Sequence, residues 1–389
     1  MHILALNAYH GGSHRAFLDG WVAHSRHRFD LLTLPAYKWK WRMRHAAVTF
    51  ADETTAQLRA GRSWDAIFCT DMLNLAEFLG LCRPELRTLP TIVYFRENQL
   101  TYPNQNSSDR DLHFAFTNLT TALAATRVWF NSAFHRDEFL SAAETLIRRM
   151  PDHRPVDAVA RIQSKADVHY PGIAESPISP STESGPLRIV WVSRWEHDKD
   201  PATFFAALRE LANRGHNFRL SVLGESFGEV PACFGAAKRE FFARIDHWGY
   251  LESAEEYQLA LAAADVVVST ADHEFFGIAV LEAVVAGCFP LVPNRLAYPE
   301  VLEGERGCFH SPTADDLAGR LAELSEKKAA GTLETGREQR VGRLLGRFGM
   351  ATSADKKDRA VELPECGAGA DANGFSTDAI ADQNFHAEF

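Results

Sequence analysis

The sequence predicts an α/β protein of two doubly wound domains that face a central cleft. At 389 residues the chain is long for one core and suits two domains of about 150 residues each. In both halves, short apolar strands alternate with segments of helical length, a pattern typical of parallel sheets. Between the halves, residues 175–186 read ESPISPSTESGP, which is rich in proline and serine and lacks periodicity. We therefore expect a first domain at 1–174, a linker at 175–186 and a second domain at 187–325.

The first domain opens with a buried-strand pattern over residues 2–6, a glycine turn and a helix. The turn carries Gly11 and Gly12, and the helical segment repeats apolar residues on one face, at Phe17, Leu18 and Trp21. Ligands of open parallel sheets bind at the carboxyl ends of the strands, where this turn lies. Further strands are expected at Phe29–Leu34, Ala66–Thr70, Thr91–Phe95 and Arg127–Asn131.

The second domain repeats the alternation of strand and helix. Strands are expected at Leu187–Ser193, Arg219–Gly224, Trp248–Leu251, Val266–Thr270 and Phe289–Pro293. The pattern fades after residue 325, although residues 336–347 suit a basic amphipathic helix. From Ala351 on, large apolar residues are scarce, and this composition favours disorder. We expect the tail, 326–389, to be partly helical or disordered.

Composition and charge exclude several classes of protein. A formal net charge of −10 argues against indiscriminate nucleic-acid binding but leaves room for a local basic patch. The N-terminus lacks the features of a signal peptide, and no run of about 18 apolar residues occurs. We expect a cytoplasmic protein without membrane contact. The sequence does not indicate its oligomeric state.

The most informative motif is HEFFGIAVLE, from His273 to Glu282. It follows a strand, and Gly277 is expected to open a helix whose N–H groups, at Phe276, Gly277 and Ile278, would bind a diphosphate. Glu274 and Glu282 would accept hydrogen bonds from sugar hydroxyls and a ribose diol. The alternative is a helix-start charge and a surface residue. The helix interior is apolar almost all round, which disfavours a carboxylate without a partner and so favours the binding site.

A second motif, RWEHDKD, lies between the first strand of the second half and a helix that Asp200-Pro201 would begin. Arg194 and Lys199 share this strand-to-helix loop. Both can reach a diphosphate, the arginine as a fork and the lysine as a point charge. The alternative, a solvated run of charges, is usual for such segments. The position at a strand end on the same side as Glu274 favours the phosphate site.

The segment KWKWRMRH of the first domain interleaves cations with indoles. RNA phosphates suit the cations and exposed bases stack on aromatic rings, so the segment could bind RNA. A strand with tryptophans buried on one face and a solvated basic face fits the alternation equally well. A second local basic cluster consists of Arg148, Arg149, His153 and Arg154. The residues proposed from the first segment are Lys38, Trp39, Lys40, Trp41, Arg42 and Arg44.

These motifs carry a family resemblance. Arg194 and Lys199, followed by Glu274 and Glu282, resemble the donor site of retaining glycosyltransferases of family 4, whose GT-B fold has two Rossmann-like domains facing a cleft. Over residues 1–325 the chain is more specifically similar to the tRNA-queuosine α-mannosyltransferase family. The strings that carry this similarity are AYHGGSH, LPAYKWKWRMR, ENQLTYP, PDHRP, RWEHDKDP and HEFFG.

The resemblance implies a reaction and a set of roles. Mannose would pass from GDP-mannose to queuosine in tRNA with retention, without a metal or other cofactor, and the leaving phosphate would take the acceptor proton. Arg194 and Lys199 would hold the diphosphate and Glu274 the transferred sugar, and these three would be the catalytic residues. Glu282 would bind the ribose, Trp248, Gly249 and Tyr250 would border the base, and Gly11 and Gly12 would approach the phosphates. The acceptor side would comprise the basic-aromatic segment together with His14, Arg96, Glu97 and Asn98.

Two departures from family 4 stand out. Arg96 occupies a position where family members commonly have a histidine, and the helix that usually crosses back to the first domain is not recognisable after residue 325. Two alternatives remain: a family 4 enzyme with a glycan, lipid or small-molecule acceptor, and a non-catalytic nucleotide-sugar or RNA-binding protein. A dehydrogenase or epimerase is disfavoured because the first glycine turn is not a GxGxxG motif.

Overall fold

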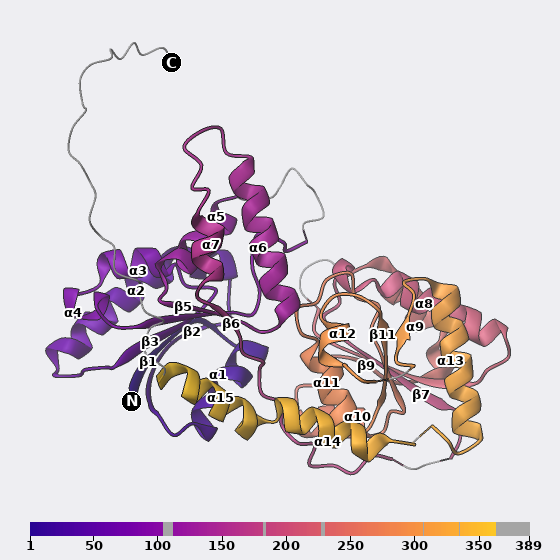
Figure 1. Ribbon diagram of the computed structural model, residues 1–389. Coiled ribbons are helices and arrows are strands. Elements are labelled where there is room, and N and C mark those ends of the chain that lie inside the picture. The colour runs from indigo at the N-terminus through magenta and orange to yellow at the C-terminus, as the bar shows by residue number, and fades with distance from the viewer. Residues whose placement is uncertain (104–111, 182–183, 227–229, 306, 334, 363–389) are drawn as a thin grey trace.

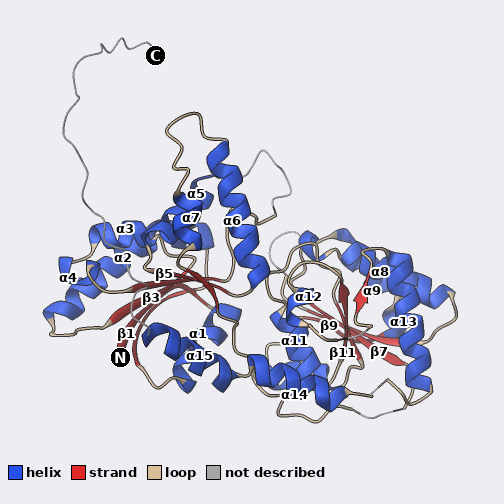
Figure 2. Ribbon diagram, in the orientation of Figure 1, coloured by secondary structure: helices blue, strands red, loops and turns tan. Residues whose placement is uncertain are grey.

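The computed structural model describes residues 1–103, 112–181, 184–226, 230–305, 307–333 and 335–362. They form two α/β domains, each with a six-stranded parallel sheet that has helices on both faces (Figures 1 and 2). The strand orders are β2-β1-β3-β4-β5-β6 and β12-β11-β10-β7-β8-β9. The predicted fold class is therefore confirmed.

The first sheet is built from strands whose alternate side chains are buried on opposite faces. Its strands are β1 (His2–His10), β2 (Arg28–Pro35), β3 (Ala66–Thr70), β4 (Thr91–Phe95), β5 (Arg127–Phe130) and β6 (Ala166–Val168). Ile67 and Cys69 pack on the face that contains Phe50 and Phe139, while Phe68 packs on the opposite face with Trp21. Burial on both faces explains why these strands are apolar throughout rather than alternating.

The helices of the first domain divide between the two faces. One face is covered by α2 (Trp39–Arg59), α3 (Leu75–Leu81), α4 (Pro84–Arg87), α5 (Leu112–Ala124), α6 (Ala133–Arg148) and α7 (Ala158–Gln163). The other face is covered by α1 (Gly12–His24) and by the last described helix, α15 (Met350–Glu362) (Figure 1).

The second domain has the same plan. Its strands are β7 (Leu187–Val192), β8 (Phe218–Leu223), β9 (Ile245–Gly249), β10 (Val266–Val268), β11 (Phe289–Pro293) and β12 (Phe309–His310). The helices are α8 (Pro201–Asn213), α9 (Ala232–Glu240), α10 (Ala254–Ala262), α11 (Ile278–Val285), α12 (Tyr298–Val301), α13 (Ala314–Ala329) and α14 (Arg337–Phe348). Phe204, Phe205 and Leu208 of α8 pack with Leu317 and Leu321 of α13 on one face, and α10, α11 and α14 cover the other.

The C-terminal segment corrects one expectation. Residues 351–362, which we expected to be disordered, belong to α15, which crosses back and packs on α1. The basic amphipathic helix expected at 336–347 is confirmed as α14, and α13 runs past the expected domain limit at residue 325. The part of the tail from residue 363 on lies outside the described residues.

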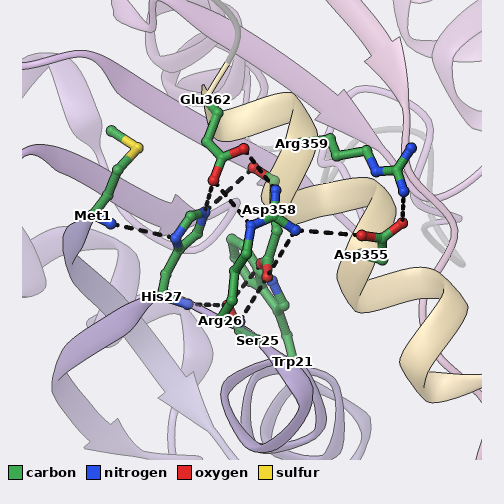
Figure 3. Close-up of polar contacts among 9 residues, drawn as sticks. All are labelled: Met1, Trp21, Ser25, Arg26, His27, Asp355, Asp358, Arg359 and Glu362. Carbon is green, nitrogen blue, oxygen red and sulfur yellow. Dashed lines mark hydrogen bonds and ion pairs between the residues drawn. The ribbon is translucent and has the colours of Figure 1, made fainter.

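The docking of α15 is polar, which explains why its composition did not reveal it. Figure 3 shows Asp358 at the centre of the contact. Its carboxylate accepts hydrogen bonds from Trp21 Nε1 at 2.9 Å, Ser25 Oγ at 2.7 Å and the Arg26 backbone N–H at 2.8 Å. Glu362 and Asp355 of the same helix pair with the Arg26 guanidinium. Because these partners lie more than 300 residues away in the chain, local patterns carry no sign of them.

Some predicted boundaries were wrong. The short strands β6 and β12 were not expected, and β9 begins at Ile245 rather than near Trp248. The basic-aromatic segment is not a strand, since β2 ends at Pro35 and α2 begins at Trp39. No helix of the described residues is long and apolar enough to cross a membrane.

Candidate active site

The predicted donor residues lie on two loops that meet at one edge of the second sheet. The first loop follows β7 and carries Arg194 and Lys199, and the second follows β10 and carries Glu274. The two strands are hydrogen-bonded neighbours, so their carboxyl ends lie side by side. Thr270 Oγ1 donates to the Lys199 carbonyl at 2.8 Å, which ties the loops together. The structure therefore brings these residues together as predicted.

Lys199, which is buried, forms an ion pair with the half-buried Glu274. Lys199 Nζ lies 3.5 Å from Glu274 Oε2 and 3.1 Å from Asp198 Oδ2, and it donates to the His273 carbonyl at 2.6 Å. Burial alone would lower the pKa of Lys199, but the carboxylates of Glu274 and Asp198 raise it above its usual range. Burial opposes ionisation of Glu274, yet Lys199 and the helix-start N–H groups hold its pKa below the usual range. Both groups are therefore charged at neutral pH.

The start of α11 differs from the expected diphosphate site. Glu274 Oε1 accepts hydrogen bonds from the N–H groups of Phe275, Phe276 and Gly277, at 3.1, 3.3 and 3.0 Å. The N–H groups of Phe276 and Gly277, which we expected to face a phosphate, thus bind the protein's own carboxylate. A carboxylate just before a helix is a favourable local cap because it meets unpaired N–H groups and the positive end of the helix dipole.

Gly277 has a geometric reason to be glycine. Its φ is +81°, and a Cβ there would lie 2.8 Å from the Tyr298 ring. Ile278 begins α11 directly after it, and its side chain is half-buried.

Glu282 has a partner that the sequence did not reveal. The Tyr257 hydroxyl, on α10, donates to Glu282 Oε2 at 2.9 Å. Burial raises the pKa of Glu282, although this hydrogen bond works in the opposite direction. The helix carboxylate that we expected to need a partner therefore has one. The contact of Glu282 with the ribose stays a prediction.

Arg194 connects the second domain to the first. Its Nη2 donates to the hydroxyl of Tyr102 at 3.1 Å, across the cleft, and lies 3.6 Å from Glu196 Oε2. Burial alone would lower the pKa of Arg194, but Glu97, Tyr102 and Glu196 together raise this pKa above its usual range. Tyr102 also packs edge-on against His273, with ring centroids 5.4 Å apart. We had not singled out Tyr102, although it lies in the string ENQLTYP.

The glycine turn of the first domain is shaped by close packing. A Cβ on Gly11 would collide with the Cβ of Ala36, and Gly12 has a φ of +49°. Arg96 donates from Nη1 to the carbonyl of Ser13, at the start of α1. The close approach of the chain at Ala36 explains Gly11 without a ligand, so its expected contact with donor phosphates stays a prediction.

Three buried polar groups gather at the carboxyl edge of the first sheet. His14, Asp71 and Arg96 are 6%, 2% and 8% exposed, and each has a buried atom without a hydrogen-bond partner, namely Nδ1, Oδ1 and Nε. Burial, together with Arg96 and Arg194, lowers the pKa of His14 well below its usual range. Burial and the neighbouring Glu97 raise the pKa of Asp71 to about 8. Unsatisfied buried polar atoms at a strand edge indicate a site for a polar ligand.

Asp71 and Asn98 follow two neighbouring strands of the first sheet, β3 and β4, but their surroundings differ. The helix after β3, α3, is capped by Asn74, so Asp71 is not its cap. Asn98 is buried, and its amide bonds His135, Thr101 and the N–H of Leu100. These internal bonds give it a structural role and argue against the acceptor contact we expected. Glu97 is half-buried in the cleft, where its charge influences Arg194.

The segment expected to border the base, Trp248 to Tyr250, is partly buried at its first residue and exposed at its last. Trp248 is partly buried and packs against the core on Phe205 and Trp195, with ring centroids 5.9 and 5.6 Å apart. Gly249 has a φ of +123°, and its carbonyl accepts from the Gly224 N–H. Tyr250 is exposed and remains free to stack on a base.

The basic-aromatic segment forms the exposed start of α2. Trp41 is 61% exposed and stacks on His45 at 5.0 Å, and Tyr37 is exposed beside it. Trp39 is half-buried and packs on Phe114, so less of its ring is open than that of Trp41. Lys38, Lys40 and Arg44 are exposed, while Arg42 donates from Nε to the Pro35 carbonyl. The second basic cluster is exposed as well, at the end of α6 and the loop after it.

Comparisons with known proteins agree with this geometry. Residues 2–173 match the family model described as tRNA-queuosine alpha-mannosyltransferase N-terminal, and residues 174–339 match that of glycosyl transferases group 1. The tRNA-queuosine alpha-mannosyltransferase of Drosophila melanogaster is 35% identical over 316 residues, which cover 78% of this chain and 82% of that protein. A glycogen synthase of Mycobacterium tuberculosis is 25% identical over 209 residues, 50% of this chain and 49% of that protein.

Solved structures show the same fold at low sequence identity. Sucrose-phosphate synthase from Thermosynechococcus elongatus has a TM-score of 0.70 at 15% identity, covering 92% of this chain and 98% of that chain. Anabaena HepE, in complex with UDP and glucose, has a TM-score of 0.62 at 14% identity, and the match covers 93% of this chain and 99% of that chain.

The two facing sheets and the donor loops define a glycosyltransferase of the GT-B fold. The enzyme is a hexosyltransferase. More narrowly, the chain belongs to the tRNA-queuosine α-mannosyltransferase family. Among the described residues, no group of three or more His, Cys, Asp or Glu side chains is arranged to hold a metal ion.

Proposed function

We propose that this enzyme transfers mannose from GDP-mannose to queuosine in tRNA, with retention of configuration and without a metal ion. The observation that carries the proposal is the convergence of Arg194, Lys199 and Glu274 on two adjacent loops that face the first domain. The Drosophila relative is a tRNA-queuosine alpha-mannosyltransferase, which supports mannose as the transferred sugar and queuosine in tRNA as the acceptor. Because the acceptor is a tRNA, the enzyme would act in the cytoplasm.

The donor would bind against the second domain. The Arg194 guanidinium is partly exposed and offers paired N–H donors to a diphosphate, which suits an oxygen-rich dianion. Lys199 would have to exchange a carboxylate partner for a phosphate oxygen, since its ammonium already meets Asp198, Glu274 and the His273 carbonyl. Glu274 keeps Oε2 toward Lys199 and would accept hydrogen bonds from the sugar hydroxyls.

The reaction would proceed on one face of the sugar. The bond between the anomeric carbon and the leaving phosphate oxygen breaks while a queuosine hydroxyl oxygen bonds to the same carbon. The proton of that hydroxyl passes to the leaving phosphate. Negative charge grows on the phosphate as the bond breaks, and the fixed charges of Arg194 and Lys199 stabilise it.

The first domain would receive the acceptor. The unpartnered atoms of His14, Asp71 and Arg96 offer a buried polar edge for hydroxyl groups. The exposed Trp41 with Lys38, Lys40 and Arg44 offers a stacking surface and phosphate contacts for the tRNA around the modified base. This division leaves the donor to one domain and the acceptor to the other.

A donor panel tests the proposal. Purified protein is incubated with queuosine-containing tRNA and either GDP-mannose, other GDP-sugars or UDP-sugars, and digested nucleosides are analysed by mass spectrometry. We expect one hexose added to queuosine with GDP-mannose and not with the UDP-sugars. Transfer from a UDP-sugar in preference to GDP-mannose would overturn the donor assignment, and hydrolysis without transfer would favour another acceptor.

A further inference from the structure

The start of helix α6, in the first domain, contacts the second-domain loop that carries Glu274. α6 begins at Ala133, and its cap, Ser132, donates from Oγ to the carbonyl of Phe275 in the second domain at 2.6 Å. His135 lies face to face with the Phe275 ring, with centroids 3.8 Å apart and planes inclined by 20°. Figure 1 shows this end of α6 next to the second domain. Phe275 is the residue directly after Glu274, so both contacts act beside the donor carboxylate.

The contact is anchored by a second-domain carboxylate. Glu300 accepts hydrogen bonds from the N–H groups of Ala133 and Phe134, at 2.8 and 3.0 Å. The first N–H groups of a helix have no partner within the helix, and the helix dipole favours an anion there. The second domain thus supplies the anion at the start of α6, and α6 in turn supplies the donor to Phe275.

His135 connects the Phe275 ring to the acceptor-side loop. Its Nδ1 lies 2.7 Å from Asn131 Oδ1, which can only accept, so Nδ1 carries the proton. Its Nε2 then accepts from Asn98 Nδ2 at 2.9 Å. Asn131 Nδ2 donates to the carbonyl of Arg96 at 3.1 Å. The buried, neutral His135 ring therefore stacks on the Phe275 ring, and its two nitrogens bond to Asn131 and Asn98 of the first domain.

The geometry explains how a contact at Phe275 reaches Glu274. The Phe275 carbonyl and the Phe276 N–H belong to one planar peptide unit, so fixing the oxygen fixes the N–H. That N–H is among the donors to Glu274 Oε1. A rotation of the peptide that frees the carbonyl from Ser132 would turn the N–H away from the carboxylate.

We propose that Ser132 and His135 are positioning residues that set the Glu274 carboxylate only when the two domains are together. The proposal rests on the mannosyl transfer proposed above, because it names residues that act on its catalytic carboxylate. Donor binding by Arg194 and Lys199 does not need these contacts, since both residues belong to the second domain. Turnover does need them, because misplacement of a catalytic group by about 1 Å can lower a rate by about 10²-fold.

The test compares Ser132→Ala and Phe275→Leu with matched controls. Ser141→Ala changes an exposed serine on the same helix, and Phe241→Leu changes a second-domain phenylalanine that is as buried as Phe275, both being 4% exposed. We expect kcat to fall roughly tenfold in the two test variants, while KM for GDP-mannose and the Kd for GDP change less than about twofold. The controls should keep the wild-type kcat, and Ser132→Thr, which retains the hydroxyl, should restore it.

Hydrogen exchange separates this proposal from the proposed reaction. In Ser132→Ala, amides of the 273–278 segment should exchange faster than in the wild type and in Ser141→Ala, whatever the substrate is. If wild-type protein transfers no mannose but this exchange difference appears, the reaction assignment fails and the positioning stands. If exchange and kcat of both test variants match their controls, the positioning proposal is overturned. The proposal would also be overturned if Phe241→Leu lowered kcat as much as the test variants do for the same loss of thermal stability.

Discussion

At the scale of residues, the donor site is a small set of charges held by one another. Lys199 keeps its charge despite burial because the carboxylates of Asp198 and Glu274 lie next to it. Glu274 keeps its charge because Lys199 and the N–H groups at the start of α11 stabilise its carboxylate. Preorganised charges of this kind stabilise a transition state without moving. Each partner therefore depends on the other for its position as well as for its ionisation.

Removing either partner of this pair should abolish most of the activity. We expect Lys199→Ala and Glu274→Ala to lower kcat by about 10²-fold or more, because each removes a fixed charge from the site of bond breaking. Lys238→Ala, an exposed lysine of α9, is the matched control and should behave like the wild type. Steady-state kinetics of mannosyl transfer provide the measurement, and near-normal turnover in both variants would refute the site assignment.

The raised pKa of Asp71 predicts a pH-dependent stability. Burial raises this pKa to about 8, so the folded state holds the proton more tightly than the unfolded state does. The stability present below pH 4 is therefore lost as pH rises toward 8, by at most about 1.4 kcal/mol per pH unit. Asp71→Asn should gain thermal stability relative to the wild type between pH 5 and pH 8, and the exposed Asp52→Asn should not. A constant difference across this range would contradict the assignment.

At the scale of elements, the donor loops were predictable because their signals are local. A strand, a short charged loop and a helix follow one another in the chain at Arg194 and again at Glu274. The roles of Tyr257 and Tyr102 were not predictable, because they arise from contacts with residues far away in the sequence. For the segment KWKWRMRH, the alternation of cations and indoles also left open a strand with one buried face. The segment instead begins helix α2, in which Trp39 packs on Phe114.

The start of α2 should contribute to binding of tRNA and not of the donor. Loss of one stacked base costs about 1–3 kcal/mol, so Trp41→Ala should raise KM for tRNA roughly tenfold while KM for GDP-mannose stays unchanged. Val48→Ala, an exposed apolar residue of the same helix, is the control. Equal effects of the two variants on tRNA binding would remove Trp41 from the acceptor surface.

Helix α15 should stabilise the protein mainly through Asp358. Asp358→Ala leaves the buried Trp21 N–H without a partner, at about 1–3 kcal/mol, and also removes the part-buried hydrogen bonds to Ser25 and Arg26. Asp355→Ala on the same helix removes half-exposed ion pairs and should cost less than about 1 kcal/mol. Urea unfolding compares the two, and similar losses of unfolding free energy would contradict the role of Asp358.

At the scale of the whole molecule, the two domains share one active site and are joined by several contacts. The α15 docking, the Tyr102–Arg194 hydrogen bond and the α6–Phe275 contact each link segments that the sequence separates widely. The doubly wound fold and the cleft were predictable from alternating strands and helices. The contacts that close the cleft were not, because they consist of single polar side chains without a periodic pattern.

The site chemistry also predicts independence from metal ions. Arg194 and Lys199 supply the positive charge that a divalent ion would otherwise bring to a diphosphate. Treatment with EDTA should therefore leave kcat within about twofold of the untreated value. If activity were lost with EDTA and restored by Mg²⁺ or Mn²⁺, Arg194 and Lys199 would not supply enough positive charge and a metal ion would be required.

The central claim is that the acceptor is queuosine in tRNA, and one measurement tests it most directly. Wild-type enzyme and GDP-mannose are incubated with queuosine-containing tRNA, with the same tRNA lacking queuosine, and with free queuosine nucleoside. Nucleosides from each reaction are then analysed by mass spectrometry. We predict that a single hexose appears on queuosine in the first reaction and that the tRNA lacking queuosine remains unmodified. Transfer to the tRNA without queuosine, or no transfer to the queuosine-containing tRNA, would contradict the account.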